Sequence, residues 1–206
     1  WNVWYRSRGC PHDGRFPLAP PLLEEIYDLT DALVVGAFLN MLQRNCRAIG
    51  LACMAQLVNV IAPIFASKDG LFRQTIYFPL LAATTLSGEV ALQVHTECDD
   101  FATKDGSRRV PYLDVSATFS PTRRKLYLSV VNFHKVQPLK FKLRLADFAV
   151  QPEATQHQIS GESPQSVNRL GNESVTLRSR RMKNVKNGST LTAPMHSMSV
   201  YEFDLL

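Results

Sequence analysis

The pattern of apolar and polar positions changes character along the chain, near Gly88. Before this glycine, stretches with apolar residues at helical spacing alternate with short, nearly continuous apolar runs. After it, short segments alternate between apolar and polar residues, the period of two that β-strands show. The pattern therefore predicts two units, a mixed α/β unit over residues 1–88 and an antiparallel β unit over residues 89–206.

The N-terminal residues predict the end of a strand, a loop and two helices. The run WNVWY at 1–5 is apolar and strand-like, and 6–21 is rich in Gly and Pro, as loops are. An apolar stripe over 22–27 predicts a first helix. A second helix is expected to be capped by Thr30 or Asp31.

A buried strand and a further helix are expected to follow. The run AIGLACMAQ at 48–56 is nearly continuous in apolar residues, which is typical of a parallel strand buried on both faces. Residues 57–66 predict the strand exit and an ordered loop, and 67–70 a turn. Residues 74–86 predict a helix that Pro79 either kinks or interrupts. The order of strand, helix, strand and helix predicts the last βα units of a TIM-type β/α barrel.

The second half predicts an antiparallel, jelly-roll-like β-sandwich. Residues 112–119 and 126–133 flank a Ser-Pro-Thr-Arg-Arg turn and predict a hairpin. In LKFKLRL at 139–145 the leucines and the phenylalanine are expected to point inward. Further strands are predicted at 90–96, 154–159, 175–178 and 198–205.

Composition excludes several classes of protein. The net charge is +5 and the pI about 9.1, but the basic residues fall mainly in turns and on alternate strand positions, so no nucleic-acid partner is expected. No apolar run approaches the ~20 residues of a membrane span, so no membrane partner is expected either. The four cysteines form no metal-binding spacing, and Cys46 and Cys53 are expected to be small core residues.

Two residues occupy positions where barrel enzymes bind their ligands, at the C-terminal ends of strands. Gln56 is a polar residue that interrupts an apolar run, so it is either a buried amide satisfied by backbone or a ligand contact at the barrel mouth. Trp4 is either a core aromatic or a platform on which a sugar stacks, and core packing is the simpler reading of this residue alone.

The other candidate residues favour structural roles. Glu24 and Glu25 are expected on a solvated helix face, and Asp99 and Asp100 in a solvated turn. His12 lies in the predicted loop after the first strand, where its role stays open. No phosphate loop, nucleophile elbow or metal motif appears.

Four motifs resemble one enzyme family: WNVWY, APPLLEEIYDLTDALVVGAFLNML, ACMAQLVNVIAPI and RQTIYFPLLAATTLSG. Together they resemble the C-terminal part of the retaining α-L-arabinofuranosidases of glycoside hydrolase family 51, densely from Trp1 to about Asn132. The resemblance implies that Trp4 lines the sugar pocket and that Gln56 hydrogen-bonds the arabinosyl unit. It also implies that the nucleophilic Glu immediately precedes Trp1 and that the acid/base Glu lies far upstream.

The resemblance implies an exo-acting enzyme that releases terminal arabinofuranosyl groups from arabinan, arabinoxylan or a related polysaccharide or oligosaccharide. It implies no cofactor and no metal, and it makes a homo-oligomeric parent an expectation. Because neither catalytic carboxylate lies in the chain, which lacks an initiator Met and begins within a strand, we expect a truncated piece without activity of its own. The sequons at Asn172 and Asn187 favour a secreted parent over a cytoplasmic one.

Two rival functions follow from other features. A non-catalytic β-sandwich module that binds carbohydrate or a protein partner would explain residues 89–206, but such a module has no need of the helical first half. A basic nucleic-acid-binding domain would explain the charge, and its binding would fall steeply with salt.

The first prediction concerns the residues that precede Trp1 in the gene. The family motif reads DEWNVWY, so we expect Asp-Glu directly before Trp1. Sequencing the gene upstream of this codon checks the prediction, and any other residue at that position removes the nucleophile assignment.

Overall fold

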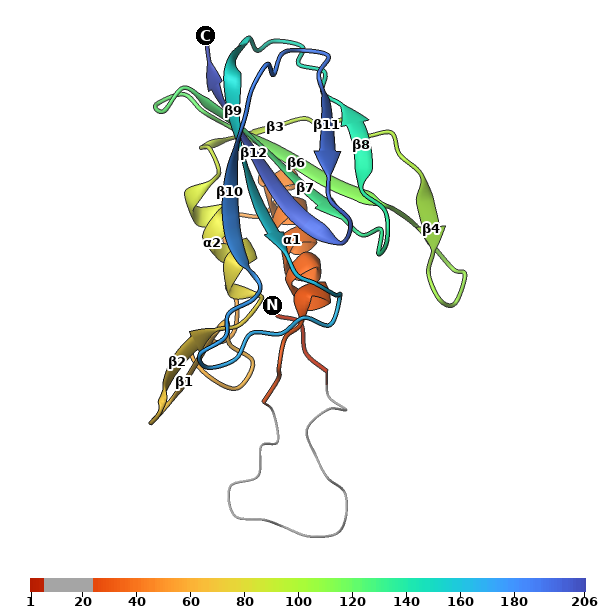
Figure 1. Ribbon diagram of the computed structural model, residues 1–206. Helices are drawn as coiled ribbons and strands as arrows, with labels where there is room; N and C mark the ends of the chain where they lie inside the picture. Colours follow the sequence, from red (N-terminus) through yellow and green to blue (C-terminus); the bar gives the residue numbers. More distant parts are fainter. Residues whose placement is uncertain (6–23) are drawn as a thin grey trace.

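The computed structural model describes residues 1–5 and 24–206 and arranges them around one antiparallel sheet (Figure 1). Two helices precede most of the strands, α1 (Leu29–Arg44) and α2 (Tyr77–Thr85). The strands are β1 (Ile64–Ser67), β2 (Gly70–Arg73), β3 (Val90–Leu92), β4 (Asp100–Ala102), β5 (Arg109–Pro111), β6 (Leu113–Ser120), β7 (Lys125–Asn132), β8 (Leu139–Lys142), β9 (Val150–Ser160), β10 (Thr176–Met182), β11 (Thr190–Ala193) and β12 (Ser197–Leu205).

The main sheet has six strands in the order β10-β9-β12-β7-β6-β3, and every neighbouring pair is antiparallel. Three two-stranded sheets accompany it, formed by β1 with β2, β4 with β5, and β8 with β11. The two central strands, β7 and β12, pair along almost their whole length. They form the middle of the molecule, with other elements on both faces of the sheet (Figure 1).

One face of the main sheet packs against the β8–β11 pair. Tyr201 and Phe203 of β12 are fully buried there, and Leu191 of β11 and Phe141 of β8 belong to the same cluster. The phenol of Tyr201 donates a hydrogen bond of 2.8 Å to the carbonyl of Thr192, which fixes the second layer to the first. This arrangement is a sandwich whose second layer is a short two-stranded sheet.

The opposite face packs against the two helices (Figure 1). Leu33 of α1 and Phe78 of α2 share a cluster with Val131 of β7 and with Met198 and Val200 of β12. Because successive strand residues point to opposite faces, β12 presents Met198 and Val200 to the helices and the two aromatic residues to the sandwich. Residues on both sides of position 88 therefore share one core, and the division into two domains at that position stays a prediction.

Helix α1 is fixed at both of its ends. Asp28 caps its N-terminus in a capping box with Asp31, rather than Thr30 or Asp31 acting as the cap. Near its C-terminus, Arg44 makes a bidentate ion pair with Asp114 of β6, at 2.8 and 3.1 Å, and Asn40 donates to the same carboxylate at 2.8 Å. These contacts set the position of the helix along the sheet.

The structure differs from the sequence-based expectation in several places of the first half. Residues 1–5 are not assigned to a strand, and the predicted loop and turn over 57–70 contain β1 and the start of β2. Residues 48–56 form no strand and are mostly exposed, and within the described residues their hydrogen bonds to a segment distant in sequence are those with Trp1 and Asn2. Residues 24–27 are not helical. Pro79 does not kink α2, since it is the third residue of the helix, where a backbone N–H has no intrahelical partner to lose.

The second half matches the expectation more closely. The predicted hairpin is formed by β6 and β7, and strands occur at each of the other predicted places. Strand β3 is shorter than predicted, ending at Leu92, and β8 ends at Lys142, although all four apolar side chains of LKFKLRL pack inward. Strands β4, β5 and β11 were not expected.

A short hairpin, β1–β2, projects from the helical end of the molecule (Figure 1). It is connected to the loop before β10 by Arg73, whose guanidinium and backbone N–H both bond the carboxylate of Glu173. The hydrogen bonds from Arg73 hold the pKa of Glu173 below its ordinary value, although partial burial acts in the opposite direction.

The second prediction uses the close approach of Gly88 to β6. A Cβ at Gly88 would overlap the backbone of Phe119 and Ser120, whereas a Cβ at Gly50 would have no heavy atom within 4 Å. We expect Gly88→Ala to lower the free energy of unfolding by about 1–3 kcal/mol. The control Gly50→Ala should stay within about 0.5 kcal/mol of the parent. Urea titrations followed by circular dichroism measure both, and equal midpoints would contradict the prediction.

The third prediction concerns the pH dependence of the tether between Arg73 and Glu173. A carboxyl group whose pKa is lowered by folding stabilises the fold above its unfolded-state pKa, and this stabilisation is lost as the pH falls through the lowered pKa. We therefore expect Glu173→Gln to be less stable than the parent at pH 7 and equally stable in acid. Thermal melts across this range test it. The exposed Glu153→Gln is the control, and a Glu173→Gln difference that persists in acid would refute the assignment.

Candidate functional site

The two extended segments that carry Trp4 and Gln56 lie side by side. The backbone N of Trp1 donates to the carbonyl of Cys53 at 2.9 Å, and the N–H of Ala55 donates to the carbonyl of Trp1 at 3.2 Å. These two bonds are the pattern of a parallel pair, with Trp1 opposite Met54. Trp4 and Gln56 therefore both lie beyond the paired residues, toward the same end of the two segments.

The backbone on both sides of Trp4 is held by buried side chains. The phenol of Tyr27 donates to the carbonyl of Val3 at 2.7 Å, and the carboxylate of Glu25 accepts from the N–H of Tyr5 at 2.8 Å. Tyr27 and Glu25 are 1% and 5% exposed, whereas Trp4 is 46% exposed. The indole is thus presented to solvent from a fixed backbone, an arrangement suited to stacking on a ligand.

Gln56 begins a short loop that is also fixed, and its side chain is exposed. Asn59 and Val60 in this loop have φ values of 61° and 60°, in the left-handed region that a β-branched residue such as Val rarely adopts. The N–H of Asn59 donates to the carbonyl of Ile64, and its side chain accepts from Ala66. Strained backbone held by surrounding contacts is commonly found at functional sites.

A buried polar network supports both segments from beneath. Gln74, three residues before the start of α2, accepts from the N–H of Tyr27 and donates to the carbonyls of Glu25 and Ala62. Burial and the neighbouring Glu25 and Asp31 carboxylates raise the pKa of Tyr27 far above its ordinary value, so its phenol remains a hydrogen-bond donor. Glu25 was expected on a solvated helix face, and this was wrong: it is buried because its segment turns inward before α1.

The remaining candidates do not gather around Trp4 and Gln56. Asp100 pairs with Arg109 across the β4–β5 hairpin, and this partner lowers the pKa of its carboxyl group. Asp99 is exposed beside it, as expected for a solvated position. His12 lies outside the described residues. Within 1–5 and 24–206, no three His, Cys, Asp or Glu side chains are placed to hold a metal ion, and no helix is long and apolar enough to cross a membrane.

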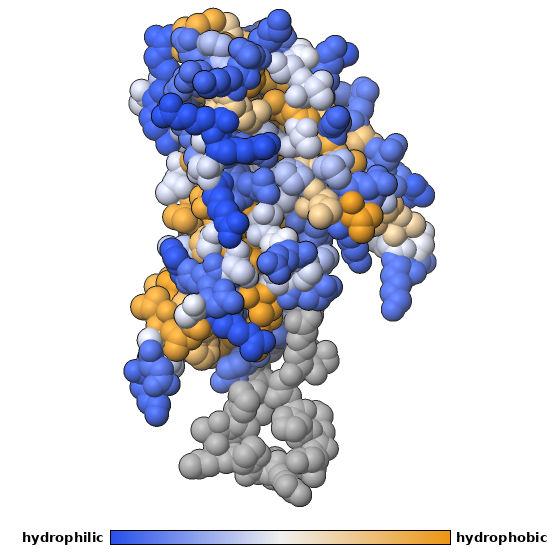
Figure 2. All heavy atoms as spheres, viewed as in Figure 1, coloured by the Kyte–Doolittle hydropathy of each residue, from blue (hydrophilic) through white to orange (hydrophobic). Residues whose placement is uncertain are grey.

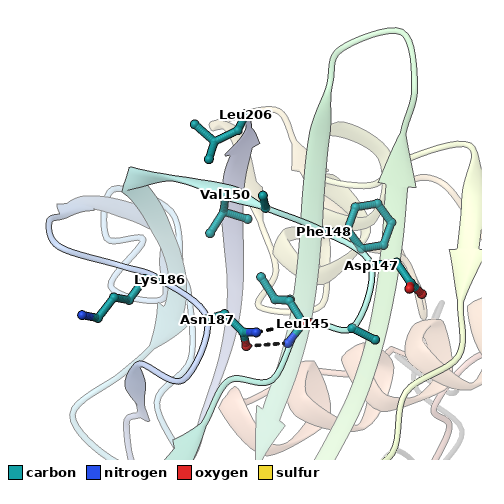
Figure 3. Close-up of a pocket in the computed structure, with 9 residues that line it drawn as sticks. Leu145, Asp147, Phe148, Val150, Lys186, Asn187 and Leu206 are labelled. Carbon is teal, nitrogen blue, oxygen red and sulfur yellow. Dashed lines mark hydrogen bonds between the residues drawn. The ribbon is translucent and has the colours of Figure 1, made fainter.

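A cavity of the described chain lies elsewhere, in the sandwich (Figure 3). It measures about 510 Å³ and is lined by the loop 145–150 together with Lys186, Asn187 and Leu206. The side chain of Asn187 accepts from the N–H of Leu145 and donates to its carbonyl, and so fixes the loop.

Apolar residues are exposed around the candidate site. Cys46 and Cys53, expected in the core, are exposed, and Leu51 and Leu57 are 84% and 71% exposed. Figure 2 shows further hydrophobic residues over the β1–β2 hairpin, where Leu71 is also exposed. Exposed apolar patches of this kind are typical of surfaces at which a protein makes further contacts.

Sequence reasoning missed Asn2 and Tyr27. The side chain of Asn2 donates to the carbonyls of Ala55 and Ile61, on either side of the loop that carries Gln56. The signal that singled out Gln56, a polar residue within an apolar run, also applies to Asn2 in WNVWY. Tyr27 gave no such signal, because an aromatic residue at helical spacing is expected in a core.

Comparisons with known proteins identify the family to which the chain is similar. Residues 1–199 match the family described as the α-L-arabinofuranosidase C-terminal domain. The intracellular exo-α-(1→5)-L-arabinofuranosidase of Halalkalibacterium halodurans is 37% identical over 150 residues, which cover 72% of this chain and 30% of that protein. The chain thus spans about a third of the length of this curated relative.

Solved structures extend the similarity to the fold. An α-L-arabinofuranosidase from Thermotoga maritima in complex with arabinose superposes with a TM-score of 0.84 at 29% identity, over all of this chain and 42% of that one. A thermostable family 51 α-L-arabinofuranosidase from Thermotoga petrophila gives the same score and identity over 98% of this chain and 41% of its own. The chain therefore belongs to the glycoside hydrolase family 51 α-L-arabinofuranosidases, within which it corresponds to the C-terminal domain.

Proposed function

We propose that this chain provides part of the sugar pocket, the end of the catalytic β/α barrel and the C-terminal sandwich of a retaining, exo-acting α-L-arabinofuranosidase. Its substrates would be arabinan, arabinoxylan or a related glycan with terminal α-L-arabinofuranosyl groups. The observation that carries the proposal is the parallel pairing of Trp1 with Met54, because it brings Trp4 and Gln56 to the same end of two neighbouring segments.

The barrel assignment is supported by the exposed apolar surface. Consecutive strands of a β/α barrel are parallel neighbours, and the two bonds between 1–5 and 53–55 are the beginning of such a ladder. The exposed apolar residues Leu51, Leu57 and Val58 would be covered by the upstream part of the same polypeptide once the ring closes. On this proposal residues 1–88 close the barrel and 89–206 form the sandwich.

The chemistry assigns limited roles to these residues. A retaining glycosidase uses two carboxyl groups about 5 Å apart, one to attack the anomeric carbon and one to protonate the leaving oxygen and then activate water. We assign the nucleophile to the residue before Trp1 and the acid/base to the upstream region. Gln56 would bind sugar hydroxyls and Trp4 would form the pocket wall, with no metal or cofactor required.

The fourth prediction tests Gln56 in the full-length gene product. Gln56→Ala should reduce kcat/KM on an aryl α-L-arabinofuranoside by an amount equivalent to about 1–3 kcal/mol, because a polar contact to the sugar is lost. Its exposed side chain should make the change neutral for stability. The exposed Gln137→Ala, in the sandwich, is the matched control. Unchanged kcat/KM in Gln56→Ala would rule out the contact.

The fifth prediction concerns the chain of 206 residues on its own. It should not hydrolyse the same substrate, because neither carboxylate of the double displacement lies within it. It should also self-associate through the exposed apolar residues around 51–58. An activity assay and size-exclusion chromatography at several concentrations check the two parts. Turnover comparable to that of the full-length enzyme would contradict the expected inactivity. A sharp monomer peak would contradict the expected self-association.

A further inference from the structure

The side chain of Asn2 connects the two segments of the candidate site. Its Nδ2 donates to the carbonyl of Ile61 at 2.5 Å and to the carbonyl of Ala55, which belongs to the peptide unit that precedes Gln56. Its Oδ1 accepts from the N–H of Val3 at 2.7 Å. All the hydrogen-bonding capacity of the amide nitrogen is therefore directed at the loop 55–61.

A second side chain converges on the same point. The phenol of Tyr27 bonds the carbonyl of Ile61 at 3.2 Å as well as that of Val3 at 2.7 Å. Both segments of the site are thus held by Asn2 from within and by Tyr27 from beneath. The ring of Tyr27 is packed in a small apolar cluster with Val35 and Ile76, so the phenol is anchored to the helices.

The loop between the two carbonyls needs this support. Its two ends, Ala55 and Ile61, are the residues that Asn2 connects, and Gln56 is the first residue between them. Asn59 and Val60 hold left-handed backbone conformations within the loop. A loop that contains strained residues keeps one conformation only while its ends are fixed.

We propose that Asn2 is a positioning residue, whose carboxamide closes the loop 55–61 and thereby sets the side chain of Gln56 relative to Trp4 for sugar binding. This inference rests on the proposed function of Gln56 and Trp4. An asparagine is suited to the role because one short planar group supplies two N–H donors for two carbonyls and an acceptor for a third partner. A carboxylate of the same size would face both carbonyls without a proton to donate.

The test is a double-mutant cycle in the full-length enzyme. Asn2→Asp preserves size and the acceptor for Val3 but removes both donors. We expect it to lower kcat/KM on an aryl α-L-arabinofuranoside by roughly 10–100-fold, the scale of a small displacement of a substrate-binding group. In a Gln56→Ala background the same change should cost about twofold or less, because the group that Asn2 positions is already absent.

Two further variants make the result specific. Asn184→Asp makes the same chemical change at an exposed residue of the sandwich and should leave kcat/KM unchanged. Tyr27→Phe keeps the buried ring and removes only the hydroxyl group, so it replaces Asn2→Asp in the test if that variant does not fold. The loss of kcat/KM that it causes should likewise be smaller in the Gln56→Ala background. Equal losses in both backgrounds would show a general structural role and overturn the proposal.

Hydrogen exchange separates this proposal from the proposed function. Amides of residues 53–62 should exchange at least tenfold faster in Asn2→Asp than in the parent and at the parent rate in Asn184→Asp. Unchanged amide exchange would overturn the role of Asn2 in closing the loop 55–61, whatever the activity of the variant. If the full-length parent shows no arabinofuranosidase activity, the proposed function fails, and the role of Asn2 in sugar binding fails with it. Faster amide exchange in Asn2→Asp would still establish Asn2 as the group that closes the loop.

Discussion

The central strands β7 and β12 are buried on both faces, and the rest of the structure depends on this. Tyr201 and Phe203 face the β8–β11 layer, while Met198 and Val200 of the same strand face the helices. A strand with apolar residues on both faces is stable only between two covering layers, since each large side chain left in water would forgo about 1.5–3 kcal/mol. Neither the helices nor the second layer can be removed without exposing one face of β12.

This constraint connects the sandwich to the candidate site. Helix α1 packs its buried face on the sheet through Leu33, and near its start it supports Tyr5, whose phenol bonds Asp31 at 2.5 Å. Tyr27, just before the helix, holds the carbonyls of Val3 and Ile61. The positions of the site segments are therefore set by helices that are themselves set by the sheet. In this way a β-rich domain can fix the positions of two neighbouring extended segments.

The sequence predicted the second half well because its signals are local. The alternation in β6 and β7 and the turn between them need only each other to form a hairpin, and the register follows from the turn. Residues 48–56 failed as a strand for the opposite reason. A parallel strand acquires its hydrogen bonds from segments far away in sequence, and among the described residues only Trp1 and Asn2 supply such bonds to 48–56. The sequence pattern shows that residues 48–56 are mostly apolar. Whether they form a buried strand depends on the neighbouring segments with which they pair.

The candidate site shows the same division. Gln56 and Trp4 could be singled out from position and resemblance. A polar residue in an apolar run and an aromatic residue at a predicted strand end can both be recognised in the linear sequence. Asn2 and Tyr27 act on backbone carbonyls 53 to 59 and 24 to 34 residues away, and nothing in a linear sequence shows which carbonyl a donor reaches. The two kinds of residue also differ in what substitution would change. A side chain that contacts the sugar affects only reactions with the sugar, whereas a donor to a strained loop affects the conformation of the loop before any ligand arrives. Residues proposed to contact the sugar can therefore be nominated from sequence, while the residues that hold their segments in place become visible only in the folded chain.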